Sequence, residues 1–369
     1  MSETFQLTTK EELYNVLNQL VAMRVSDIYV TANKPLEFKQ VDDVHRSTAI
    51  APGEELLIEF INSVGDAKIE GLLSDISKHP SGQIDGAISM PGAEGSATQR
   101  FRYNFFRVLD YDTKRQTVKI ALRPLSDKIP APAELGIPSD LVKRVVGLDQ
   151  GLILVCGKTG AGKSTSLASL IQCRSDEKKE HLVTLEQPVE YLFRNDNSSI
   201  SQREVGISTD SFASGLRAAL RQSPNVILIG EIRDRETAEI ALSAAESGHI
   251  VFGTLHTSNA AHSIERFVHI FPTNAQDSVW NVLSNALQVI ICQTLVKDTE
   301  GHRIAAREIL ITEVGIAAYI KKKDLPGIQR GIEAGKDRGM VTWERAANEL
   351  SRQGLIKDEI KEKIIALGN

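Results

Sequence analysis

Cysteine is scarce in this chain of 369 residues, which has only Cys156, Cys173 and Cys292, far apart from one another. An odd number of widely spaced cysteines forms neither a disulfide framework nor the paired ligands of a zinc site. Long hydrophobic runs are missing too, since no apolar stretch approaches the roughly 18 residues that span a bilayer. The first residues lack the basic and then apolar pattern of a signal peptide. We therefore expect a cytoplasmic protein without a transmembrane segment.

Aromatic residues and positive charge are also in short supply. Aromatics make up 5% of the sequence, and 43 Lys and Arg against 48 Asp and Glu leave a formal net charge of −5. A protein that follows a nucleic-acid backbone and stacks its bases needs a basic groove and aromatic side chains. We therefore predict no direct nucleic-acid partner. A helicase stays open as an alternative, but little in the sequence supports it.

The rest of the composition is that of an ordinary globular protein, with 41% hydrophobic and 25% charged residues. The length is enough for two or three domains. Residues 1–123 are expected to form a small mixed domain, because a segment of helical periodicity is followed by runs that alternate as strands do. The helix is expected at 11–22, and the clearest strands are expected at 27–31, 100–108 and 116–125.

A linker and a second, larger domain follow. Residues 124–138 are expected to be the linker, because the stretch RPLSDKIPAPAELGIP carries four prolines, which oppose helix and central strand. From 139 to 272 the short apolar runs GLILVCG, HLVTLE, NVILIGE and GHIVFGTLH alternate with helical stretches. This alternation is typical of a parallel α/β sheet whose strands are buried on both faces. Residues 273–369 are expected to be mostly helical.

The segment GKTGAGKS follows the first of these apolar runs and precedes a helical stretch. It fits the pattern G-x-x-x-x-G-K-[ST] in the strand–loop–helix context that the pattern requires. Glycines let the backbone close around phosphate oxygens, and the N–H groups at the helix start point at the anion. A tight turn is the alternative. The residues predicted to bind nucleotide are Gly157, Lys158, Thr159, Gly160, Ala161, Gly162, Lys163, Ser164 and Thr165.

A candidate catalytic carboxylate stands at the end of another expected strand. In NVILIGEIRD the apolar run delivers Glu231 to its carboxyl end, where ligands gather in open α/β sheets. A carboxylate there can orient and polarise the attacking water. The alternative is a surface turn in which Glu231 forms an ion pair with Arg233. Gly230 occupies the place in which a magnesium-shell aspartate is usual.

Two further polar residues follow strands of the same expected sheet. Glu186 ends the run VTLE and could act in the outer shell of Mg²⁺ or of the water, although a plain surface acid is an equal alternative. His256 follows the run HIVFGTL and could sense the γ-phosphate by hydrogen bonding. A histidine satisfied within the core is its alternative. The histidines are not spaced as zinc ligands, so we predict no zinc site.

Four of these segments together resemble the PilT/VirB11 superfamily of secretion and type IV pilus ATPases. They read GKTGAGKS, TLEQPVE, VILIGEIRD and GHIVFGTLHT, in the family's order of glycine loop, acidic box, Walker B strand and histidine box. The resemblance extends upstream to SDIYV, RFRYNFF and PAELGIP and downstream through RFVHIFP to the helical end. It therefore covers nearly the whole chain.

The resemblance implies an α/β protein, in which a PAS-like α+β domain precedes a RecA-like P-loop ATPase domain with a helical C-terminal region. It also implies an ATP hydrolase that uses ATP and Mg²⁺, forms a homo-hexameric ring and works at the inner membrane through secretion or pilus proteins. Lys163 and Ser164 match the phosphate and Mg²⁺ ligands. The residues that match the family's catalytic positions are Glu231, Glu186, His256, Arg102 and Arg123, the two arginines having a solvated strand face as their alternative.

Three departures from the family pattern bear on the function. The acidic box has Gln187 where Asp is usual, and a neutral amide cannot supply the same charge to the metal shell. The four-cysteine zinc module of type II secretion and pilus-extension ATPases is missing. The segment close to AIRNLIRE in pilus-retraction ATPases is here GIAAYIKKKD, at 315–324, which puts retraction in doubt.

These departures favour the type IVB secretion and conjugation branch, in which the ring would power a membrane-associated secretion apparatus. A pilus-retraction motor shares the same chemistry and is the first alternative. A nucleotide-gated docking module with little hydrolysis is the second, and Gln187 is the residue that favours it. A small-molecule kinase is the fourth and most distant of these interpretations. The sequence has no motif for a second substrate pocket, and a kinase would leave the N-terminal domain unexplained.

Overall fold

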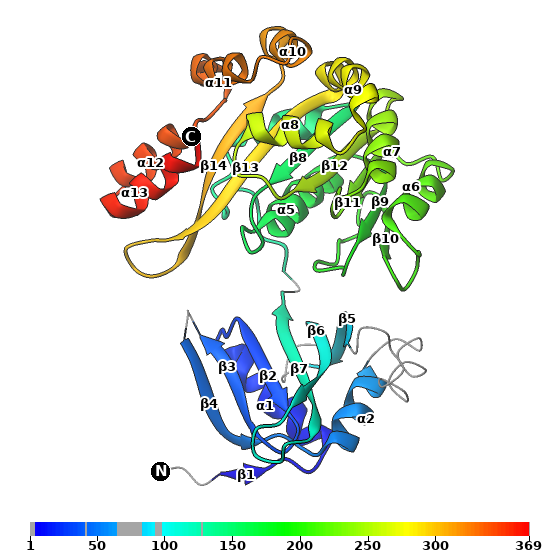
Figure 1. Cartoon of the computed structure of the whole chain (residues 1–369), viewed down its shortest axis with the longest axis vertical. Helices are drawn as coiled ribbons and strands as arrows, with labels where there is room; N and C mark the ends of the chain where they lie inside the picture. Colours follow the sequence, from blue (N-terminus) through cyan, green and yellow to red (C-terminus); the bar gives the residue numbers. More distant parts are fainter. Residues whose placement is uncertain (1–3, 41–42, 65–82, 93–97, 127, 369) are drawn as a thin grey trace. The chain divides into compact units, whose positions relative to one another are not determined.

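The computed structural model describes residues 4–40, 43–64, 83–92, 98–126 and 128–368. The chain divides into two compact units (Figure 1). The first comprises residues 1–128 together with 188–191, and the second comprises 129–187 and 192–369. Among the described residues, no helix combines the length and the apolar character needed to cross a bilayer.

The first unit is built on a seven-stranded sheet in the order β1-β4-β3-β2-β7-β6-β5. Neighbouring strands pair antiparallel except β1 and β4, which are parallel. The predicted strands at 27–31 and 116–125 are confirmed as β2 and β7. The strands are β1 (Phe5–Gln6), β2 (Asp27–Thr31), β3 (Pro35–Gln40), β4 (Asp43–Ile50), β5 (Gln83–Pro91), β6 (Thr98–Leu109) and β7 (Gln116–Leu125).

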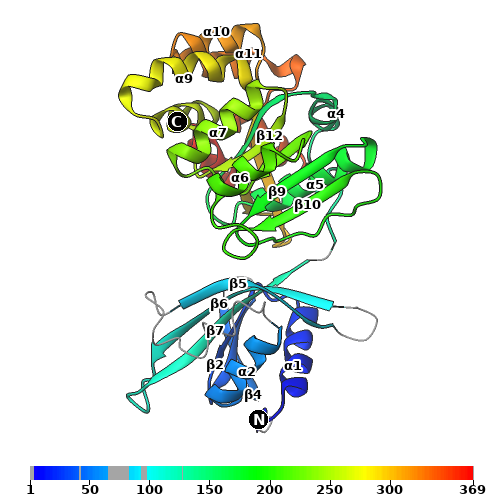
Figure 2. The ribbon, with the colours of Figure 1, turned by 90° about the vertical axis from the view of Figure 1, so that its right-hand side faces the viewer.

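Two helices, α1 (Lys10–Ala22) and α2 (Glu54–Val64), cover one face of this sheet (Figure 2). α1 begins where the Thr9 side chain accepts from Glu12 N while the Glu12 side chain accepts from the Thr9 backbone, a reciprocal capping box. Its buried residues Leu13, Leu17 and Leu20 recur at three and four positions, so they form one stripe against the sheet. The core of this unit lies between the helices and the inward side chains of the strands.

The second unit contains another seven-stranded sheet, in the order β10-β9-β11-β12-β8-β13-β14. All neighbours pair parallel except β13 and β14. Every residue of β8, β11 and β12 is buried, as predicted for strands covered on both faces. The strands are β8 (Gly151–Cys156), β9 (His181–Glu186), β10 (Ser199–Glu204), β11 (Val226–Ile229), β12 (Ile250–Leu255), β13 (Leu287–Lys297) and β14 (Arg303–Ile311).

Helices connect these strands and follow them. Five of the ten α-helices described here begin at a side chain that accepts from the first turn, such as Ser211 before α6 and Asn259 before α8. The α-helices are α4 (Ser139–Gly147), α5 (Lys163–Glu177), α6 (Phe212–Leu220), α7 (Arg235–Glu246), α8 (Ala260–His269), α9 (Thr273–Ala286), α10 (Val314–Lys321), α11 (Leu325–Ala334), α12 (Trp343–Arg352) and α13 (Asp358–Ile365). Two single 3-10 turns are η1 (Lys336–Arg338) and η2 (Ala366–Gly368).

The C-terminal region is helical except for a β-hairpin that the sequence analysis did not predict. β13 and β14 extend the sheet beyond β8, and α12 packs on β14 (Figure 1). The apolar run LQVIICQTLVK follows α9 directly, and periodicity alone does not distinguish a buried strand from a buried helix. Its parallel pairing with β8, far away in sequence, decides for the strand.

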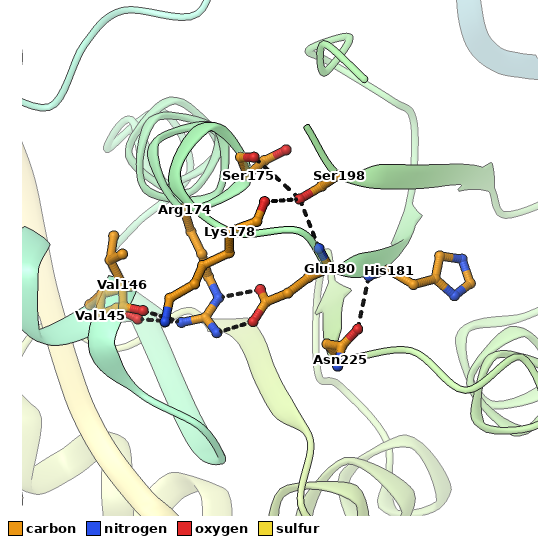
Figure 3. A network of polar contacts seen from close by, with 9 residues as sticks. All are labelled: Val145, Val146, Arg174, Ser175, Lys178, Glu180, His181, Ser198 and Asn225. Carbon is orange, nitrogen blue, oxygen red and sulfur yellow. Dashed lines mark hydrogen bonds and ion pairs between the residues drawn. The ribbon is translucent and has the colours of Figure 1, made fainter. Parts of the chain in front are cut away.

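A buried ion pair joins the end of α5 to its neighbours (Figure 3). Arg174, whose side chain is 1% exposed, donates to both carboxylate oxygens of Glu180 at 2.7 and 2.6 Å. Its remaining donor group reaches the carbonyl oxygens of Val145 and Val146 at the end of α4, at 2.9 and 2.7 Å. A cation at the C-terminal end of a helix satisfies carbonyls that have no partner within the helix. The network therefore fixes α4, α5 and the start of β9 relative to one another.

Candidate functional site

The glycine loop predicted to bind phosphate spans residues 157–162, between the end of β8 and the start of α5. Gly162 has φ +80° and is the residue at which α5 begins, a left-handed conformation that glycine adopts without a Cβ penalty. Gly157 also has a positive φ, of +149°, and a Cβ there would overlap the backbone carbonyl oxygen of Gln293 on β13. These two positions explain why the strand breaks into glycines before the helix.

Some helices of the second unit begin at a capping side chain, and others, namely α4, α5, α9, α10 and α13, do not. α6, α7, α8 and α12 each begin with a side-chain cap, from Ser211, Asp234, Asn259 and Thr342. Within the described residues α5 has no side-chain cap and no acidic residue in its first turn. The positive end of a helix that carries no capping oxygen favours a bound anion. The loop geometry therefore fits a phosphate group.

Lys163 is positioned to serve such an anion. Its Nζ donates to the carbonyl oxygens of Gly157 at 2.8 Å and of Lys158 at 3.2 Å, so the ammonium lies over the loop. Ser164 follows it on an exposed position of the first turn. A hydroxyl and carboxylates are the hard oxygen ligands that suit Mg²⁺, which keeps several waters and binds largely through substrate phosphates. Ser164 fits that role, and Glu186 lies at the end of β9, which β11 and β12 separate from β8 in the sheet.

Glu186 ends β9 and is held by hydrogen bonds within the sheet edge. Its Oε1 accepts from the Thr184 hydroxyl at 2.7 Å and from the Gln202 amide on β10 at 3.2 Å. The carboxylate is thus oriented by two uncharged donors. A carboxylate oriented by such contacts can in turn orient a water or a metal-bound water.

Glu231 lies beside the end of β11, on a turn that its neighbours hold in place. Gly230 N donates to Leu185 O at 2.7 Å, and Thr254 Oγ1 on β12 donates to Gly230 O at 2.5 Å. A Cβ at Gly230 would lie 3.1 Å from the Leu185 carbonyl oxygen. The β9 backbone thus lies close to Gly230, and a side chain at this position would require it to shift by a few tenths of an ångström.

The structure brings Glu231 and His256 together. His256 Nε2 lies 2.9 Å from Glu231 Oε1, and Arg233 forms an ion pair with the same oxygen. The predicted catalytic carboxylate thus contacts both the predicted sensor and the arginine of the alternative interpretation. The side chain of Arg233 is 72% exposed, so this ion pair is weak and easily exchanged for water.

Arg102 and Arg123 lie in the first unit, directly opposite each other on β6 and β7. Arg123 donates to Asp27 Oδ1 through Nε and an η nitrogen, at 2.9 and 2.7 Å. Arg102 lies 3.6 Å from a carboxylate oxygen of Glu190, a residue that groups with this unit. The two predicted arginines are therefore neighbours on one sheet face.

Two polar residues that sequence reasoning missed lie directly behind the glycine loop. Gln293 on β13 and Arg307 on β14 are both buried and hydrogen-bonded to each other. The only signal in the sequence was the Gln293 amide within the apolar run VIICQTLV. Both residues line a cavity of about 990 Å³, whose wall also includes Gly162, Thr165 and Leu135. The cavity thus adjoins the start of α5.

The comparisons with known proteins identify the family of this chain. The family model described as type II/IV secretion system protein matches residues 126–341, which is more than half of the chain. The type IV pilus retraction ATPase PilT of Pseudomonas aeruginosa is 35% identical over 339 residues, covering 90% of this chain and 92% of that protein.

Two solved structures are similar over nearly their whole length. The pilus retraction motor PilT with bound ADP is 36% identical with a TM-score of 0.79, covering 95% of this chain and 96% of that one. The ATPase DotB of Legionella pneumophila is 25% identical with a TM-score of 0.80, covering 100% and 99%. Family, fold and glycine loop agree, and the chain therefore belongs to the type II/IV secretion system protein family as an ATPase of the PilT/VirB11 superfamily.

Proposed function

We propose that the chain is a ring-forming motor that hydrolyses ATP at the glycine loop to drive a bacterial pilus or secretion machine. The observation that supports this most directly is the contact between Glu231 and His256, at 2.9 Å. Both residues follow strands of the sheet whose β8 leads into the loop, and parallel strands deliver their carboxyl ends to one edge. A carboxylate and a phosphate loop on one edge are the parts that ATP hydrolysis requires.

In this proposal each residue has one task. Lys163 and the first turn of α5 bind the β- and γ-phosphates, while Ser164 holds Mg²⁺ with Glu186 behind it. When bound, Mg²⁺ neutralises charge that develops on the phosphate oxygens. Glu231 orients the attacking water, and His256 holds that carboxylate and responds when the γ-phosphate leaves. The cavity of about 990 Å³ beside the loop has room for the nucleoside.

The arginines and the ring form the second part of the proposal. Arg102 and Arg123 are neighbours on β6 and β7 and point to a shared role. An arginine that reaches the transferring phosphate contributes roughly 10³–10⁵ in rate in other NTPases. We propose that they do so in a homo-hexamer, docked through partner proteins at the cytoplasmic side of the inner membrane. Hydrolysis then releases them and moves the domains.

The choice of machine depends on two observations that favour different branches. Identity is 36% to the PilT motor and 25% to DotB, each over at least 95% of this chain, which favours a pilus-retraction motor. The α10 region supports the type IVB interpretation instead, because GIAAYIKKKD carries three lysines, all exposed. We propose a retraction-type motor first and a type IVB secretion or conjugation motor second.

Turnover of ATP per subunit against protein concentration tests the motor. We expect turnover to rise as subunits associate and to vanish in Glu231→Gln. We expect Lys163→Ala to lose nucleotide binding. Glu231→Gln should still bind ATP, since the amide keeps the volume but cannot activate water. Tight ATP binding with negligible turnover at every concentration would instead favour the docking module, for which Gln187 is the motivating residue. Rapid turnover by Glu231→Gln would refute its assigned role.

The branch is tested in the organism that carries the gene. The chromosomal copy is replaced by the Glu231→Gln variant, and surface pili, twitching and substrate transfer are measured in the same cells. A retraction motor predicts accumulated pili and no twitching with normal transfer. A secretion or conjugation motor predicts normal pili and lost transfer. The unchanged parental allele, reintroduced in the same way, is the control.

A further inference from the structure

Gln293 contacts the glycine loop through both its side chain and its backbone. It lies on β13 with 3% of its surface exposed, and its Nε2 donates to the Ala161 carbonyl oxygen at 2.5 Å. Its backbone carbonyl is the group against which Gly157 packs, and its Nε2 is 3.1 Å from where a Cβ of Gly162 would stand. The loop therefore contacts Gln293 at its start, at Gly157, and at its end, at Ala161 and Gly162.

The orientation of the Gln293 amide is fixed by its other contacts. Oε1 accepts from the Ser166 hydroxyl at 2.8 Å and from Arg307 Nε at 3.3 Å. A guanidinium has only donors, so the amide oxygen must face Arg307. The amide nitrogen must then face Ala161. A flipped side chain would set two donors against each other and present an oxygen to the loop carbonyl.

Arg307 is a buried cation without a carboxylate partner among the described residues. Its surface is 7% exposed, and burial lowers its pKa to about 10. One η nitrogen donates to the Leu135 and Gly136 carbonyl oxygens at 2.8 and 3.3 Å, and the other lies 3.4 Å from Ser166 Oγ. An unpaired buried charge is costly. A packed apolar residue would serve stability better, so the guanidinium has another use.

We propose that Gln293 is a positioning residue for the phosphate loop, and that Arg307 locks its amide in the orientation that supports the loop carbonyl of Ala161. With that carbonyl tied back to β13, the loop keeps its N–H groups turned to the other side, toward the anion. The proposal rests on the loop binding nucleotide phosphates, as proposed above. It assigns Gln293 no contact with the nucleotide itself.

The decisive variant is Gln293→Glu. The carboxylate still accepts from Ser166 and gives Arg307 the counter-ion that it lacks, so the fold keeps or gains stability. It cannot donate to Ala161, and the two oxygens repel. An unsatisfied buried carbonyl costs enough to lower affinity for MgADP at least about tenfold. Because the loop holds ground state and transition state alike, KM for ATP should rise by a similar factor while kcat changes little.

A second variant separates loop support from charge. Gln293→Met is neutral, has nearly the same volume and also lacks the donor, so it should lose MgADP affinity as Gln293→Glu does. The matched control is Gln276→Glu on α9. The Gln276 amide nitrogen also donates to a backbone carbonyl oxygen, that of Phe271 at 3.0 Å, but away from the loop. This control should bind MgADP as the wild type does.

Binding of MgADP is measured by isothermal titration calorimetry and stability by urea unfolding. Weak binding by both Gln293 variants, with Gln293→Glu as stable as the wild type, supports the proposal. Three results would overturn the proposal. Either variant could bind MgADP with wild-type affinity, the affinity could fall only in Gln293→Glu, or the loss of affinity could merely follow a loss of stability. If the wild-type chain binds no MgADP, the proposed function is refuted, and this inference is refuted with it. If only the predictions for Gln293→Glu and Gln293→Met fail, the proposed function still stands.

Discussion

Glu308 on β14 is the buried carboxylate whose charge should make stability depend on pH. Its surface is 0% exposed, and Oε2 accepts from the Ala260 N–H at the start of α8 at 2.6 Å. Oε1 has no hydrogen-bond partner within the described part of the chain. Burial raises its pKa to about 7 from an ordinary 4.5, while the Ala260 N–H and the Gln329 side chain oppose the shift. We predict that Glu308→Gln removes this dependence.

The sign follows from which state holds the proton. Between pH 4.5 and about 7 the folded chain keeps the proton of Glu308 while the unfolded chain has released it. Stability from this group is therefore present at low pH and is lost as the pH rises through that window. One pKa unit corresponds to about 1.4 kcal/mol, so the full loss is about 3 kcal/mol above pH 7.

The chain carries its own probe for this experiment. Both of its tryptophans, Trp280 and Trp343, lie in the second unit and are buried. Urea unfolding followed by tryptophan fluorescence therefore reports on the unit that contains Glu308. The free energy of unfolding of Glu308→Gln, minus that of the wild type, should grow by about 2–3 kcal/mol from pH 5 to pH 8. The new amide also changes the free energy of unfolding by an amount that does not vary with pH. The test is therefore how the difference between variant and wild type changes with pH.

Glu246→Gln is the matched control, because this glutamate is exposed on α7 in the same unit. Its difference from the wild type should stay flat over the same range. A flat difference for Glu308→Gln, or one that falls with pH, would mean that the carboxylate is ionised in the folded state at pH 5. The reasoning from burial would then be refuted.

Two further changes test other parts of the second unit. Arg174→Met leaves Glu180 with its charge but without its partner. We therefore expect the free energy of unfolding to fall by about 3 kcal/mol in the same urea assay. A loss below about 1 kcal/mol would show that the pair adds nothing to stability. Gly230→Asp restores the acid usual for this position but pushes its Cβ against the β9 backbone, so we expect stability to fall by about 1–3 kcal/mol and ATP turnover to drop rather than rise. Turnover above the wild type would show that the site lacked only a carboxylate.

Local patterns in the sequence carried much of the fold and the site. The strands at 27–31 and 116–125 were predicted with the bounds that the structure has, because alternation of apolar residues is a local property. The glycine loop was found because its residues are contiguous. Glu231 and His256 were placed at one sheet edge because both follow buried runs, and parallel strands end together.

The hairpin of β13 and β14 was missed for a physical reason. Its apolar run fits a helix as well as a strand, and only the pairing with β8 in the folded sheet distinguishes the two. The same holds for Gln293 and Arg307, which are ordinary polar residues in the sequence. Their importance comes from the loop lying directly over them, a relation across more than one hundred residues that no local pattern records.

Short contiguous motifs were enough to predict the chemistry of this protein, because a phosphate loop, a candidate catalytic carboxylate and their order along the chain can be read locally. Which residues contact that loop and that carboxylate was settled only by folding. It placed Glu231 between His256 and Arg233, brought the β9 backbone close to Gly230, and set Gln293 against the loop. Motifs are local and survive in a linear reading, whereas contacts between distant segments exist only once the chain has folded.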